Sequence, residues 1–142
     1  MRVLIDTNIL LDFFFDREPY NVYADRVLKM CGNYELQGFI AAISIPNAFY
    51  ILRKDHPADE RRKMLLDICG FLSIVGIDSA KIWGALINSE FTDFEDCLQD
   101  ECAVACGADY IITRNIKDFA HSTVPPITAE DFLKLIDKQR IV

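Results

Sequence analysis

The sequence predicts an α/β fold in which a mainly parallel sheet is covered by helices on both faces. Short apolar segments alternate with longer segments of helical periodicity from one end of the chain to the other. Strands that alternate with helices in this way are typical of parallel sheets, whose crossover helices cover the sheet. Because no linker or low-complexity segment interrupts the alternation, we expect residues 1–142 to form a single domain.

In the first third of the chain, a strand over residues 2–5 is followed by two helices. The strand is apolar after Arg2 and stops at Asp6. A first helix then continues with Ile9, Leu10, Phe13 and Phe14 at helical spacing. Residues 21–34 carry their apolar side chains on one stripe, which predicts a second helix.

The middle third repeats the alternation without repeating the sequence. Residues 38–42 form the second expected strand, and residues 45–52 form a helix entered through Ser44 and Pro46. Residues 59–70 predict an amphipathic helix with a charged exposed face at residues 60–63. We expect a strand within residues 71–77, after which Asp78 and Ser79 begin another helix.

The last third contains two helices and one strand. A helix is expected over residues 94–107 and a strand over residues 110–112. The pair Pro125–Pro126 indicates a turn, and residues 128–131 begin the final helix.

Composition narrows the class of protein. With 142 residues, of which 51% are hydrophobic and 26% charged, the chain can bury a core without disulfides or metals. It contains no apolar run of about eighteen residues. Nor does it begin with the pattern of a secretory signal, so we expect a cytoplasmic protein without a membrane segment.

Cysteines and charge exclude some kinds of site. The five cysteines lie mostly in apolar stretches and lack the paired short spacings of a zinc site, so we interpret them as reduced core thiols. The net charge of −7 disfavours nonspecific binding to nucleic acid, which depends on Lys and Arg. A nucleic-acid substrate would need bound cations or a local basic patch.

Asp6 is the first candidate site residue. It ends the first strand, and ligands of open α/β folds bind beyond the carboxyl ends of strands. The alternative is that Asp6 only caps the following helix. The functional interpretation therefore needs other carboxylates that converge on Asp6.

A second acidic group lies on the expected helix that follows residue 93. At about 100° per residue, Asp93, Asp96 and Asp100 fall within an arc of roughly 60°, while apolar residues occupy the broadly opposite face. A solvated helix face, with Asp93 as N-cap, is the alternative.

Asn115 and Asp118 follow the strand over residues 110–112, although each is also a residue type that is common in turns and helix caps. Carboxylates that come together repel one another unless a cation neutralises them, which indicates a hard divalent metal such as Mg²⁺ or Mn²⁺. Such an ion suits phosphodiester hydrolysis.

Three segments in this order resemble the PIN domain family. They are residues 4–12 (LIDTNILLD), residues 93–96 (DFED) and residues 112–119 (ITRNIKDF). The resemblance implies a three-layer α/β/α sandwich and a metal-dependent ribonuclease. It also implies a toxin of a bacterial toxin–antitoxin pair, with RNA as substrate, an antitoxin protein as partner and a homodimer as assembly.

The resemblance assigns roles by position. Asp6 and Asp96 become metal-binding acids, Asn115 and Asp118 share the last acidic position, Thr113 supports the final turn and Asn8 lines the site. Asp93 and Asp100 are kept as outer candidates. Arg114 and Lys117 flank the last segment and could contact RNA phosphates.

The chain departs from the family at the second strand-to-helix junction, where Asn47 stands in place of a common glutamate. Asn brings no charge and cannot act as a general base. Asn47 therefore favours an alternative in which a degenerate PIN fold binds a protein or RNA without cleaving it. A phosphatase of another fold is disfavoured, because Asn8 occupies the place of its second aspartate.

Residues Phe13, Phe14 and Phe15 allow two interpretations. They add aromatic surface to the first helix, which either packs in the core or contributes to a dimer interface.

Overall fold

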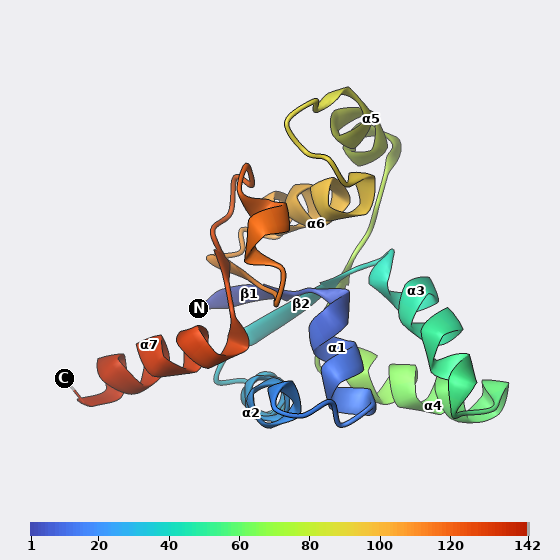
Figure 1. The fold of residues 1–142 in the computed structure, drawn as a ribbon, viewed down its shortest axis with the longest axis vertical. Coiled ribbons are helices and arrows are strands. Elements are labelled where there is room, and N and C mark those ends of the chain that lie inside the picture. Colours follow the sequence, from blue (N-terminus) through green and yellow to red (C-terminus); the bar gives the residue numbers. More distant parts are fainter. Residues whose placement is uncertain (142) are drawn as a thin grey trace.

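The computed structural model describes residues 1–141 and consists of helices and strands in alternation (Figure 1). In chain order the elements are β1 (Arg2–Ile5), α1 (Thr7–Phe14), α2 (Tyr20–Gly32), β2 (Gln37–Ala41), α3 (Ser44–Ile51), η1 (Leu52–Lys54), α4 (Ala58–Cys69), β3 (Ser73–Val75), α5 (Ser79–Ile87), α6 (Phe94–Ala105), β4 (Tyr110–Ile112), η2 (Ile116–Phe119), β5 (Pro126–Ile127) and α7 (Ala129–Ile141).

The strands form one parallel sheet in the order β3-β2-β1-β4-β5. In the register of the sheet, Val3 of β1 lies opposite both Gly38 of β2 and Tyr110 of β4. The chain runs outward from β1 to β2 and β3, then returns to the other side of β1 for β4. The order of strands therefore reverses at β1 and β4, and such a switch point leaves a crevice at the carboxyl edge of the sheet.

Alternate residues of β1 pack on opposite faces of the sheet, as the two-residue period of a strand requires. Val3 and Ile5 belong to the larger core, together with Phe132 of α7 and apolar residues of α1 and α2. Leu4 belongs to the core on the other face, which includes Cys102 of α6. Figure 1 shows α5 and α6 on one side of the sheet and α1, α2 and α7 on the other, which confirms the predicted three-layer α/β/α fold.

The structure corrects two boundaries. The third strand covers only Ser73–Val75 of the expected 71–77. Pro126, expected in a turn, instead begins β5 and pairs with Ile111. A proline has no N–H to donate, but β5 is an edge strand, where that loss is tolerated.

The packing of β2 explains its glycine. A Cβ on Gly38 would lie 2.5 Å from Cδ2 of Leu72 and 2.7 Å from Sγ of Cys31. Only a residue without a side chain lets α2 and the segment before β3 approach the sheet this closely.

The core contains most of the cysteines and part of the aromatic surface of α1. All five cysteines are free thiols, four of them buried, and burial raises the pKa of Cys31 to about 12. The side chains of Phe13, Phe14 and Phe15 are partly buried against the core clusters, which favours the packing interpretation. Between residues 1 and 141, no helix is long and apolar enough to cross a membrane.

Candidate active site

Asp6 follows β1 directly and is 6% exposed. Its Oδ1 accepts a hydrogen bond from the backbone N–H of Thr7 (2.8 Å), so Asp6 does cap α1 as the alternative interpretation held. Its Oδ2 accepts from Nδ2 of Asn8 (3.1 Å) and from the hydroxyl of Thr113 (2.7 Å). Asp6 therefore caps α1 and also contacts the polar side chains of Asn8 and Thr113.

The turn after β4 is tied to the turn after β1. The fully buried hydroxyl of Thr113 donates to Asp6 and accepts from the backbone N–H of Asn115 (3.0 Å). The backbone N–H of Arg114 donates to Oδ1 of Asn8 (3.3 Å). These bonds hold Asn115 beside Asp6 at the switch point of the sheet.

The third contribution comes from the first turn of α6. Asp93 caps this helix, because its Oδ1 accepts from the backbone N–H of Asp96 (2.9 Å). Glu95 accepts from Nδ2 of Asn47 on α3 (3.2 Å). The N-terminal turn of α6 thereby presents two carboxylates, Glu95 and Asp96, toward the carboxyl edge of the sheet.

These side chains surround one cleft of about 460 Å³. It is lined by Asp6, Thr7, Asn8, Leu11, Asn47, Tyr50, Ile51, Glu95, Asp96, Gln99 and Asn115. Of the four candidate metal ligands predicted from the sequence, Asp6, Asp96 and Asn115 line the cleft. Asp118, in η2, lies outside this lining set, although its charge raises the pKa of both Asp6 and Asp96.

Burial and mutual repulsion govern the acidity of the site. Burial raises the pKa of Asp6, against the hydrogen bonds from Thr113, Thr7 and Asn8. Burial also raises the pKa of Asp96, and the charges of Asp93, Asp6, Asp118 and Glu95 add to this effect, so that its pKa is about 7. A positive charge in the cleft would relieve this repulsion.

The donor set suits a hard divalent cation, although it is not a preformed cage. Within residues 1–141, no three His, Cys, Asp or Glu side chains are grouped closely enough to ligate one ion. Mg²⁺ needs only one or two carboxylates, since it keeps several of its waters. Gln99 lines the cleft and is 3% exposed, and its Oε1 has no hydrogen-bond partner among the described residues. An unpaired oxygen of this kind is suited to a bound water of such an ion.

Two acidic residues differ from their expected roles. The sequence makes Asp100 an outer candidate, but its buried carboxylate accepts hydrogen bonds from the backbone N–H groups of Thr123 and Val124 at 3.0–3.1 Å and holds that loop. Sequence reasoning missed Glu95, which lines the cleft. The sequence shows that Asn47 stands where a carboxylate is common in the family. No sequence pattern shows that the carboxylate of Glu95 approaches Asn47.

Comparison with known proteins agrees with this architecture. A family model described as PIN domain matches residues 2–117. The chain is 28% identical over 141 residues to Ribonuclease VapC1 from Aquifex aeolicus, with 92% of each protein covered.

Two solved structures share the fold. A toxin–antitoxin complex from Klebsiella pneumoniae has a TM-score of 0.68 at 26% identity, covering 89% of this chain and 97% of that one. The structure of VapBC2 from Rickettsia felis bound to a promoter DNA fragment has a TM-score of 0.67 at 18% identity, covering 90% and 98%. Since the family model spans most of the chain, the chain belongs to the PIN domain family.

Proposed function

We propose that this protein is a metal-dependent endoribonuclease that hydrolyses phosphodiester bonds of RNA and acts as the toxin of a toxin–antitoxin pair. The observation that carries the proposal is the convergence of Asp6, Asp96 and Asn115 on one cleft, with the charge of Asp118 acting on both acids. Support for the substrate and for an antitoxin partner comes from two relatives, one named a ribonuclease and one solved as a toxin–antitoxin complex.

Asp6, Asp96, Asn115 and Asp118 are the residues that would hold Mg²⁺ or Mn²⁺. When bound, the ion neutralises the phosphate, stabilises the leaving oxygen and lowers the pKa of the attacking water. The protein's own residues fix the geometry: Thr113 and Asn8 orient the Asp6 carboxylate, and the same hydroxyl of Thr113 holds the backbone at Asn115. We also propose that the protein is cytoplasmic and forms a homodimer. Residues 1–142 are proposed to form one domain.

The second candidate is a PIN-fold module that binds a partner without cleaving RNA. Asn47 favours it, because the α3 position contributes an amide to the cleft in place of a carboxylate.

Cleavage of a mixed single-stranded RNA pool by purified protein with Mn²⁺ or Mg²⁺ separates the two candidates. We expect cutting that is abolished by EDTA, by Asp6→Asn and by Asp96→Asn, each variant being checked for folding by circular dichroism. Folded wild-type protein that cuts no RNA with either metal would overturn the ribonuclease proposal and favour the binding module.

A further inference from the structure

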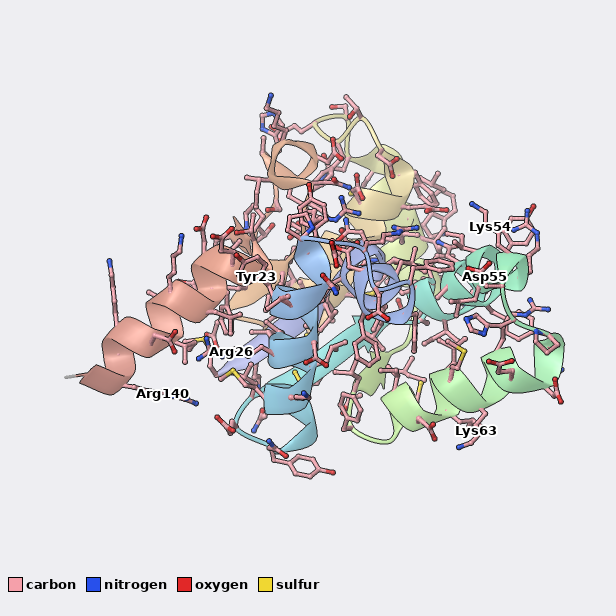
Figure 2. All side chains as sticks on the ribbon, turned by 60° about the horizontal axis from the view of Figure 1, so that its bottom comes forward. Tyr23, Arg26, Lys54, Asp55, Lys63 and Arg140 are labelled. Atoms are coloured by element: carbon pink, nitrogen blue, oxygen red, sulfur yellow. The ribbon has the colours of Figure 1, made fainter. Side chains whose placement is uncertain are left out.

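A second cavity, of about 180 Å³, lies on the other side of the turn after β4. It is lined by Ile9, Asp12, Tyr20, Tyr23, Arg114, Asn115, Thr128, Ala129 and Glu130. Asn115 lines both this cavity and the acidic cleft, so the two hollows are neighbours. In Figure 2, Tyr23 lies on α2 near α7, the two helices that form the outer walls of the cavity.

The cavity has a rigid, flat wall. The guanidinium of Arg114 lies 4.3 Å from the ring centroid of Tyr20, in a stacked contact. Its Nε lies 2.8 Å from Oδ2 of Asp12, which is fully buried. Arg17 adds a second, longer ion pair to Asp12 at 3.8 Å. Arg114 is thus held from one edge by a buried carboxylate and from one face by an aromatic ring.

The Asp12–Arg114 contact leaves hydrogen-bonding capacity unused. Nε of Arg114 and both carboxylate oxygens of Asp12 are buried and have no hydrogen-bond partner of good geometry within residues 1–141. Buried polar groups without partners are uncommon in folded proteins, and a water or ion bound beside them is one explanation.

The charge of the cavity disfavours a phosphate. Asp12 neutralises Arg114, and Glu130 adds a carboxylate to the wall. A phosphate would meet both acids, whereas a neutral planar group would stack on the guanidinium or on Tyr20 and hydrogen-bond to Thr128 or Glu130. Bases of single-stranded RNA are bound in this way, by stacking on aromatic rings and guanidinium planes.

We propose that this cavity binds the base of a nucleotide next to the phosphate held in the acidic cleft. The assignment rests on the proposed ribonuclease function, and it changes the expected role of Arg114 from a phosphate contact to a base contact. Tyr20 is the residue to test, because it is 43% exposed and can be replaced without opening the core.

The direct test is NMR titration of metal-free ¹⁵N-labelled protein with each of the four ribonucleosides and, separately, with ribose 5-phosphate. We expect at least one nucleoside to shift the backbone amides of Ala129 and Glu130 and the Nε–H of Arg114, while ribose 5-phosphate does not. Tyr20→Ala should weaken this binding roughly tenfold, and Tyr20→Phe should preserve it because the ring remains. Val22→Ala, an exposed change on the same helix, is the matched control.

Two results would overturn the assignment. One is the absence of shifts for every nucleoside at several millimolar, and the other is a response to ribose 5-phosphate equal to that of the nucleosides. Because this titration requires no cleavage, it is independent of the proposed activity. If wild-type protein cuts no RNA but the nucleoside shifts are present, the ribonuclease proposal fails while the base site stands.

Discussion

The negative charge of Asp96 is unfavourable in the metal-free protein. Burial and four neighbouring carboxylates raise its pKa to about 7, and no basic group is among the causes that act on it. The folded state therefore binds a proton on Asp96 more tightly than the unfolded chain does. Stability from this group is fully present below about pH 4 and is lost as the pH rises through 7.

We therefore expect Asp96→Asn to stabilise the metal-free protein at pH 8, by about 1 kcal/mol or more, the equivalent of one unit of pKa shift. At pH 4 most of the difference should be gone, because Asp96 is then neutral in the folded protein. Chemical denaturation in EDTA at the two pH values measures the effect. Asp137→Asn is the control of opposite sign, since the hydrogen bond from Arg26 lowers the pKa of Asp137. If Asp96→Asn is less stable than wild type at pH 8, the neighbouring carboxylates do not destabilise the charged form of Asp96.

Glu95 is positioned to supply the negative charge that Asn47 lacks. It lines the cleft, accepts a hydrogen bond from Asn47 and raises the pKa of Asp96 through its charge. We expect Glu95→Gln to weaken Mn²⁺ binding roughly tenfold in isothermal titration calorimetry, the lower end of the effect of an outer ligand. Adding Asn47→Glu to that variant should restore the affinity.

Glu90→Gln is the matched control, because Glu90 lies outside the set of residues that line the cleft. Equal Mn²⁺ affinities for wild type and Glu95→Gln would remove Glu95 from the site.

At the scale of elements, α6 has two separate acidic functions. Its first turn presents Glu95 and Asp96 to the cleft, while Asp100, one turn further, binds the loop before β5. Three backbone hydrogen bonds, two from Thr123 and one from Val124, end on the Asp100 carboxylate. This contact fixes the loop between η2 and β5.

Asp100→Ala should therefore destabilise the protein by about 3 kcal/mol, because it leaves N–H groups without their charged acceptor. Thermal unfolding measures the loss. Asp67→Ala, which removes an exposed carboxylate from α4 and its ion pair with Lys63, should change stability by less than about 0.5 kcal/mol. An equally small effect at Asp100 would show that the loop does not depend on this carboxylate.

At the scale of the whole molecule, the net charge of −7 sets the conditions for binding RNA. Three of the exposed basic residues, Lys54, Lys63 and Arg140, lie toward the periphery of the molecule (Figure 2). Arg26 and Arg140 are further engaged in ion pairs with Asp137 and Glu35. The excess of acidic residues in the whole protein therefore disfavours phosphates at the acidic site.

Millimolar Mg²⁺ should consequently strengthen binding of single-stranded RNA, although divalent ions ordinarily compete with proteins for phosphates. Fluorescence anisotropy within seconds of mixing, before cleavage proceeds, measures the affinity with and without Mg²⁺. In the Asp6→Asn variant, Mg²⁺ should no longer increase the affinity for RNA. If wild-type protein binds RNA more weakly with Mg²⁺ than without it, the bound ion does not offset the negative charge of the cleft.

The resemblance to the PIN domain family selected Asp96 from the acidic face of its helix. The sequence by itself determined the α/β alternation, most element positions and the candidates Asp6, Asn115 and Asp118. Local patterns suffice for these predictions, because the spacing of apolar residues and the positions of turns depend on neighbours along the chain. Strands 110–112 and 2–5 end in polar turns, and parallel strands must bring such ends together.

Only the tertiary structure decided which acids face the cleft. Asp96 and Asp100 share a helix face within one turn, yet one lines the cleft and the other binds Thr123 and Val124. The approach of Glu95 to Asn47, the burial of Asp12 against Arg114 and the strand at Pro126 likewise depend on partners far along the chain. Sequence periodicity assigns a residue to a face, whereas packing determines what that face meets.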